Sequence, residues 1–264
     1  MQKSVNLYFN PNFDTAEKLR TMQRLGYDAF FTGIYDGNEN LTWRAQIDLA
    51  RELGLELTMM HCRYGDTDYV NSFWLPGTMG DELCDDYIQQ IQACGGLTSN
   101  FVVHLHDANP PEPSVIGLVR LQKMLKACEP FGMNLCVENL YSATEIPYIF
   151  SHVEHPLLKI CYDSGHRHWL TPDFDLVQRF HQFITVLHLH QNDGTADQHQ
   201  ILTPGSPVFE RLVREIPLLN LETTLAAEIK VSTGPCEQIL ADNLQALNRL
   251  EAAVLSAARQ ASLE

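Results

Sequence analysis

The sequence predicts a single-domain α/β protein with the (β/α)8 TIM barrel fold, spanning residues 1–264. Its 264 residues match the roughly 250 residues that one such barrel needs. Helical stretches alternate with short apolar runs along the whole chain, and about eight such runs can be counted. No GxGxxG or Walker phosphate loop follows the first run, which disfavours an open dinucleotide-binding sheet.

A recurring unit supports this alternation, because a helical stretch, a glycine and an apolar run follow one another repeatedly. Gly26, Gly54, the pair Gly95 and Gly96, and Gly132 stand between helix and run. Glycine in that position typically ends a helix in the left-handed conformation. A run that is apolar throughout indicates a strand buried on both faces. The expected strands cover residues 5–9, 29–34, 55–61, 101–106, 134–138, 158–163, 184–190 and 225–229.

Two segments do not fit this alternation of helices and strands. A long Ala- and Leu-rich helix is expected near residues 237–258. The longest irregular piece, residues 64–80, follows the third expected strand, and we hypothesise that it is a mobile lid over the barrel mouth.

The net charge, the cysteine count and the lack of long apolar runs limit the kinds of partner and compartment that are expected for the protein. Lys and Arg total 18 against 33 Asp and Glu, a formal charge of −15, so no nucleic-acid partner is expected. The seven cysteines are odd in number and form no CxxC pair, which indicates free thiols in a reducing, cytoplasmic compartment. The N-terminus lacks the apolar stretch of a signal peptide, and no run of about 18 apolar residues occurs. We therefore expect no membrane association.

The expected strands cease to be apolar at their C-terminal ends, where ionisable residues appear. A buried carboxylate is costly unless it is paired or holds a metal. In barrels, catalytic groups gather at the C-terminal mouth. The alternative is a buried ion-pair network with Lys159 or Lys230. The strand-end residues are His61, His104, His106, Glu138, Asp163, His166, His188, His190 and Glu228.

The chemistry of this set indicates a divalent metal. Imidazole and carboxylate donors without cysteine suit zinc, manganese, iron or cobalt better than calcium, and magnesium stays open. Asp197 and His199 follow the seventh expected strand, and in an extended loop their spacing places both side chains on one side. We expect one ion, with room for more than one.

These motifs resemble the xylose isomerase-like TIM barrel superfamily, which includes sugar phosphate isomerases and epimerases and is related to endonuclease IV. The resemblance covers nearly the whole chain and rests on VENLY, CYDSGH, HLHQNDG followed by DQH, and AAEIK. It implies a metal held by Glu138, Asp163, His188 and Glu228. It further implies that the substrate is bound at His61, His104, His166, Asp197 and His199.

The resemblance also implies an activity, metal-dependent isomerisation or epimerisation of a small carbohydrate. A divalent ion can polarise a sugar carbonyl and stabilise an enediolate. Two carboxylates on opposite sides of the sugar can then remove and return a proton, and Glu138 and Glu228 are assigned to these catalytic roles. His166 would orient a substrate oxygen. Trp74, within residues 64–80, is expected either to stack on the sugar ring or to anchor the expected lid by apolar contact. Homo-oligomers are common among such proteins, so a homo-oligomer is one of the states that the sequence leaves open.

Two other activities fit the same residues. An endonuclease IV-like phosphodiester hydrolase would use up to three metals, and all its ligand types have counterparts among the residues named. Gly165 replaces the cysteine of the repair enzymes, and the Ser-Lys pair of their seventh-strand loop is missing. His199 stands near an arginine position of the sugar epimerases. A lyase or dehydratase could work through the same enediolate, and a sugar-binding barrel without activity is a further alternative.

Overall fold

Eight parallel strands form the centre of the molecule in the computed structural model, which describes residues 1–34, 41–219 and 224–261. They follow one another in space in the order β7-β6-β5-β4-β3-β2-β1-β8. A parallel bridge between Leu189 and Ala227 joins the two ends of this row. The ring therefore closes, which confirms the predicted barrel. The strands are β1 (Lys3–Asn6), β2 (Ala29–Gly33), β3 (Glu56–His61), β4 (Asn100–Val103), β5 (Asn134–Glu138), β6 (Leu158–Asp163), β7 (Ile184–His188) and β8 (Leu225–Ala227).

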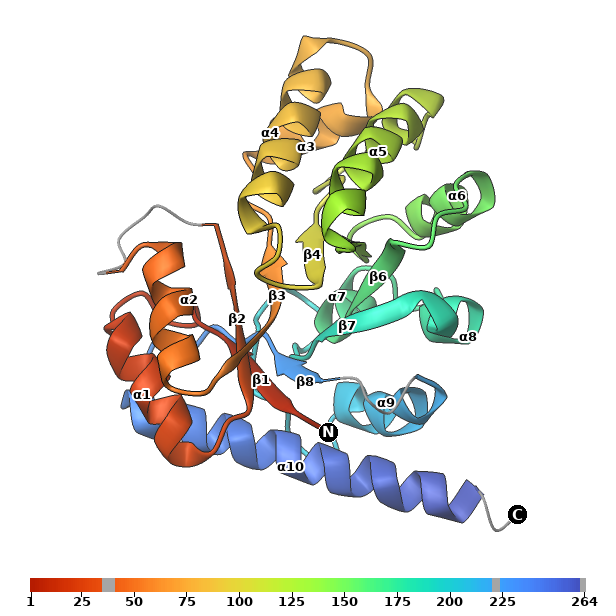
Figure 1. The fold of residues 1–264 in the computed structure, drawn as a ribbon. Coiled ribbons are helices and arrows are strands. Elements are labelled where there is room, and N and C mark those ends of the chain that lie inside the picture. The colour runs from red at the N-terminus through yellow and green to blue at the C-terminus, as the bar shows by residue number, and fades with distance from the viewer. Residues whose placement is uncertain (35–40, 220–223, 262–264) are drawn as a thin grey trace.

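Helices surround the strands, as the ribbon shows (Figure 1). The longest, α10, packs along α1 and α9. The α-helices are α1 (Thr15–Leu25), α2 (Trp43–Glu52), α3 (Thr67–Asn71), α4 (Thr78–Cys94), α5 (Val115–Cys128), α6 (Glu145–His152), α7 (Ser164–Trp169), α8 (Leu176–Phe180), α9 (Pro207–Glu215) and α10 (Cys236–Ala261). Short 3-10 helices are η1 (Ser72–Trp74), η2 (Glu129–Phe131), η3 (His181–Phe183) and η4 (Ile216–Leu218).

Two apolar clusters form the core. The larger lies between strands and helices, as alternation of side chains across each strand requires. The smaller fills the barrel interior and takes one residue from each of seven strands. Its members are Phe31, Met59, Val102, Cys136, Cys161, Val186 and Ala226. The interior is therefore packed, and a ligand can enter only at an end of the barrel.

The predicted helix ends are largely confirmed. Gly26 has φ 87° and its backbone N–H bonds the carbonyls of Met22 and Gln23, as a left-handed helix cap does. Gly54 and Gly132 also have positive φ, and in the double glycine the left-handed residue is Gly96. All seven cysteines are buried and free, as expected. Within the described ranges, no helix is long and apolar enough to cross a membrane.

The segment expected to be an irregular lid is instead folded against the barrel. Within residues 64–80, α3 and η1 form, and Val70 and Phe73 are fully buried. Arg120 of α5 donates hydrogen bonds to the carbonyls of Ser72, Phe73, Leu75 and Gly77. The lid prediction was wrong because a buried arginine from a distant helix holds this segment in place.

Candidate metal centre at the barrel mouth

A small pocket opens at the C-terminal ends of the strands. It encloses about 120 Å³ and brings together side chains from strands and loops far apart in the sequence. Because the ends of all parallel strands face the same side, the strand-end residues converge there. The lining residues are Tyr8, His61, Tyr64, His104, Glu138, His166, Asp197, His199, Glu228 and Lys230.

Glu138, the last residue of β5, lies at the centre of this mouth and is 1% exposed. Its Oε2 atom lies 2.9 Å from His104 Nε2 and 3.3 Å from His61 Nε2. Its Oε1 atom lies 3.1 Å from His188 Nδ1 and 3.4 Å from His166 Nδ1. One carboxylate thus contacts imidazoles on two sides.

His188 joins Glu138 to two further carboxylates. Its Nδ1 atom lies 3.3 Å from Glu228 Oε2 and 4.0 Å from Asp163 Oδ2. Donor atoms of these four residues all lie within 4.8 Å of one another. The ring of Phe31 stacks on His188 with centroids 5.2 Å apart, which fixes the imidazole plane. The structure therefore brings together the four residues expected to bind one metal.

Asp163 is fully buried and has a second role at the start of α7. Its Oδ1 atom accepts the backbone N–H of His166 at 2.7 Å, which caps the helix. His190 Nε2 lies 3.0 Å from the same carboxylate. A Cβ atom added to Gly165 would lie 2.0 Å from His190 Cε1, so the missing side chain of this glycine makes room for the ring.

A second group of donors adjoins the first. His166, His190, Asp197 and His199 place one donor atom each within 4.8 Å of the others. The rings of His190 and His199 are stacked with centroids 4.1 Å apart. His199 Nε2 lies 2.7 Å from Asp197 Oδ2. Asp197 and His199 are thus neighbours at the mouth, as their spacing predicts, although His199 has a left-handed φ of 46° and the loop is not fully extended there.

The pKa values of these groups depend on one another. Burial alone would raise the pKa of Glu228, but the charges of His188 and His199 lower it to about 2. Burial alone would likewise lower the pKa of His166, yet Asp163, Asp197 and Glu138 raise it well above its ordinary value. The Glu228 carboxylate is therefore ionised at neutral pH and is stabilised by positive charge beside it.

The donors fit a divalent cation. His61 donates from Nδ1 to the carbonyl of Cys62 at 2.9 Å, and His199 donates from Nδ1 to the carbonyl of Glu228 at 3.0 Å. In a neutral ring, Nε2 then presents a lone pair toward a carboxylate oxygen. Two lone pairs that face each other need a proton or a cation between them. Buried atoms without a hydrogen-bond partner adjoin the same site, namely His166 Nδ1, His190 Nδ1 and Asp197 Oδ1.

Trp74 does not reach the mouth. It is 1% exposed, and its Nε1 donates to Glu145 Oε2 at 2.8 Å. The same carboxylate oxygen lies 2.5 Å from His106 Nδ1, while His106 Nε2 accepts the backbone N–H of Ser142 at 3.1 Å. The expected stacking of Trp74 on a sugar was wrong, because η1 turns its indole beneath α5. His106 holds the loop after β5 and is not a lining residue.

Three lining residues were missed from the sequence. Tyr8 OH donates to Glu228 Oε1 at 2.7 Å. Tyr64 is 42% exposed and stacks on His104 with ring centroids 4.4 Å apart. Lys230 lines the pocket beyond β8. Tyr8 stands two residues beyond the end of β1, and Lys230 stands three residues beyond the end of β8. That position is the signal that could have identified them.

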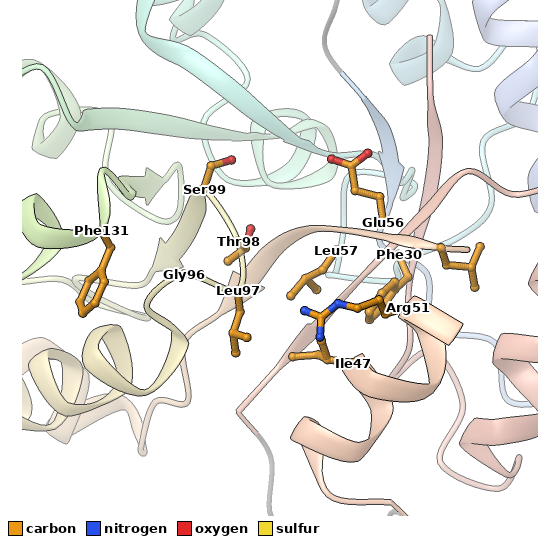
Figure 2. A pocket seen from close by; sticks show the side chains of 11 residues that line it. Phe30, Ile47, Arg51, Glu56, Leu57, Gly96, Leu97, Thr98, Ser99 and Phe131 are labelled. Carbon is orange, nitrogen blue, oxygen red and sulfur yellow. The ribbon is translucent and has the colours of Figure 1, made fainter. Parts of the chain in front are cut away.

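A larger cavity of about 530 Å³ lies at the opposite end of the barrel. Figure 2 shows it between Ile47 and Arg51 of α2 and the residues before β4, with Leu97 and Thr98 facing the gap. Its lining mixes apolar side chains with polar ones such as Arg51 and Glu56, and none of the mouth donors contributes to it. Since barrel chemistry occurs at the C-terminal face, the smaller pocket is the candidate site.

The sequence pattern of the family described as xylose isomerase-like TIM barrel matches residues 19–250. The chain belongs to this family. A curated relative, the uncharacterized protein y4fM of Sinorhizobium fredii, is 26% identical over 108 residues. That match spans 38% of this chain and 35% of the relative, so the chain corresponds to about a third of the relative's length.

Solved structures of similar fold include sugar epimerases. An L-ribulose 3-epimerase matches with a TM-score of 0.78 and 12% identity over 100% of this chain and 98% of its own. A D-psicose 3-epimerase from Clostridium cellulolyticum H10 matches with a TM-score of 0.68 and 14% identity, over 98% and 99%. A 3-keto-D-glucoside 4-epimerase from E. coli matches with a TM-score of 0.65 and 15% identity, over 96% and 100%. At these identities the likeness establishes the fold.

Proposed function

We propose that the protein is a divalent-metal-dependent isomerase or epimerase of sugars or sugar-like substrates. The observation that carries the proposal is the convergence of Glu138, Asp163, His188 and Glu228 within 4.8 Å at the barrel mouth. Solved structures of similar fold are epimerases of ketoses and a keto-glucoside. Both the donor set and these names favour a polyhydroxylated carbonyl compound as substrate.

The four residues at the mouth have different roles in the proposed reaction. Glu138 and Glu228 are the acid/base pair that removes and returns the proton on the carbon beside the sugar carbonyl, and an enediolate of the sugar forms between the two transfers. When bound, a divalent ion would polarise that carbonyl and offset the charge that develops on its oxygen. Asp163 and His188 would complete the ion's ligands.

Neighbouring side chains orient the two glutamates. His61 and His104 hold Glu138 Oε2, and the Tyr8 hydroxyl holds Glu228 Oε1. His166 lies between Glu138 and Asp197, at 3.4 and 3.6 Å, where it can orient a substrate oxygen. The packed barrel interior excludes water from beneath the site.

Turnover in heavy water tests the mechanism. Protein loaded with manganese, cobalt or zinc is incubated with ketopentoses and ketohexoses, and the recovered sugars are examined for deuterium. We expect deuterium at the reacting carbon. Glu138→Gln and Glu228→Gln should each lower kcat about 10³-fold, since general acid–base catalysis contributes factors of that order. Lys126→Met, on the exposed face of α5, is the matched control. A product formed without any solvent deuterium would count against the acid/base pair.

A phosphodiester hydrolase with several metals is the second candidate. The adjoining donors His166, His190, Asp197 and His199, and a third group of His61, His104 and Glu138, favour it. Metal content per chain decides between the two candidates. One tightly bound ion with sugar turnover supports the epimerase, whereas three ions with cleavage of a phosphodiester support the hydrolase. A lyase or dehydratase would be revealed by a product lighter by one water.

A further inference from the structure

Lys230 occupies a defined place at the rim of the mouth. It follows Glu228 by two residues beyond β8, and its backbone N–H donates to the carbonyl of His199 at 2.9 Å. This bond ties the end of β8 to the loop that carries Asp197 and His199. The position of the main chain at Lys230 is therefore fixed, while its side chain is exposed and lines the pocket.

The ammonium group of Lys230 forms no ion pair with a carboxylate in the part of the chain that the structure describes. It is the one lysine or arginine that lines the pocket, and no ion pair within 4.0 Å among those residues includes it. The carboxylates nearest the pocket already have imidazole partners, since Asp197 contacts His199 and Glu228 contacts His188. The Lys230 ammonium is thus placed where it can pair with an anionic group of a bound ligand.

The two sides of the pocket differ in chemistry. Tyr64, stacked on His104, presents a neutral aromatic face on the side of β3 and β4. Lys230 presents a cationic group at the end of β8, beside the loop that carries His199. Between them lie Glu138 and Glu228, the proposed acid/base pair. A substrate whose reacting carbon lies between the glutamates can therefore extend one end toward Lys230.

We propose that Lys230 determines specificity by pairing with an anionic group at one end of the substrate. The substrate class would be ketoses that carry a terminal carboxylate or phosphate. This inference rests on the proposed isomerase or epimerase function and narrows its substrate class. A carboxylate or phosphate oxygen would accept a charge-assisted hydrogen bond from the Lys230 ammonium at the partly desolvated rim.

Equilibrium binding to the manganese-loaded protein tests the inference. The probes are the 2-ketopentoses and 2-ketohexoses, each compared with its terminal phosphate and its terminal carboxylate. We expect at least one charged member to bind about tenfold more tightly than its neutral parent. The phosphate and carboxylate arms distinguish the two sources of charge. Lys230→Met should remove this advantage and leave binding of the neutral parent unchanged, and Lys230→Arg should retain it.

Kinetics provide the second readout. For a charged substrate that turns over, Lys230→Met should raise KM about tenfold with little change in kcat, because the contact is the same in ground and transition states. Lys126→Met is again the matched control. Equal binding of charged and neutral members throughout the set, or equal losses for both in Lys230→Met, would overturn the inference. Binding that depends on Lys230 without any turnover would instead overturn the proposed function and leave the assignment of Lys230 intact.

Discussion

At the scale of single residues, the mouth depends on side chains that hold the metal donors in place. His190 is fully buried, and its contact with Asp163 aims one carboxylate of the proposed four-residue centre. Its backbone is fixed by Ser164, whose hydroxyl donates to the His190 carbonyl at 2.7 Å and accepts from its N–H at 3.0 Å. Partners of metal ligands commonly affect metal affinity tenfold or more.

A pair of substitutions tests whether His190 positions Asp163. Replacing His190 by Leu should weaken metal binding about tenfold, because the aspartate loses its hydrogen bond. Replacing it by Gln, whose amide nitrogen can occupy the Nε2 position, should retain most of the affinity. Metal dissociation constants and thermal midpoints would be measured together. Equal affinities for His190→Leu and the wild type would show that Asp163 is oriented without this ring.

The strand-end donors could be predicted because ionisable residues directly after apolar runs are costly without partners. Glu138, Asp163, His188 and Glu228 all lie where that reasoning puts them. Trp74 could not be placed, because the sequence does not show that Glu145 accepts its indole N–H across 71 residues. Tyr8 and Lys230 were missed because a tyrosine or lysine near a strand end is common at a surface.

At the scale of elements, strands β5 and β6 have the bounds that their apolar runs predict. Strands β7 and β8 end earlier than predicted, at His188 and Ala227, since the chain beyond turns to bring side chains over the mouth. Helix α3 and the turn η1 were not expected. Asp66 caps α3 by accepting the N–H of Tyr69, whereas η1 is held by Arg120 from a distant helix.

The role of Arg120 can be tested by removing its guanidinium. Arg120→Met would leave several buried carbonyls without a donor, so the free energy of unfolding should fall by about 3 kcal/mol. Arg120→Lys should recover only part of this loss, since one ammonium cannot reach all of these acceptors. Denaturant unfolding measures the effect, with the exposed Arg51→Met as the control. A loss no larger than that of Arg51→Met would contradict the role.

Helix α10 is tied to the first strand by Glu251, which lies 2.6 Å from Lys3 Nζ. Burial raises the pKa of Glu251, but Lys3 and the N-terminal ammonium lower it by more, so the pKa lies below its ordinary value. A depressed folded pKa means that the contribution is fully present above the unfolded pKa and is lost as pH falls through the folded value. Glu251→Gln should therefore cost about 1 kcal/mol at neutral pH and almost nothing in strong acid.

The matched control for that substitution lies on the same helix. Glu237 pairs with Arg24 at 3.7 Å, but both side chains are more than half exposed, so Glu237→Gln should have almost no effect at either pH. Urea unfolding at neutral and acidic pH compares the two variants. If Glu251→Gln lowers the free energy of unfolding by the same amount in acid as at neutral pH, the loss would come from altered packing and not from the missing charge.

At the scale of the whole molecule, an ion bound at the mouth would stabilise the ring of strands. The four proposed ligands come from β5, β6, β7 and the end of β8, so an ion would link both ends of the strand row. Removing metal with a chelator should lower the thermal midpoint, and adding it back should restore the midpoint in proportion to the logarithm of metal concentration. In the Asp163→Asn variant, the fall of the thermal midpoint with chelator and its recovery with added metal should both be much smaller. A midpoint insensitive to metal in the wild-type protein would argue that the mouth does not bind one.

The close contact between the backbone of Gly165 and the ring of His190 has an evolutionary consequence. Because a Cβ at this position would overlap His190, a relative with any other residue at the position of Gly165 must have a smaller side chain at the position of His190, or must move the ring out of the cluster. The two positions should thus change together across the family. Relatives with glycine and histidine at these two positions would have all four donors of the second group, namely His166, His190, Asp197 and His199. Relatives that lack this histidine would have three of them.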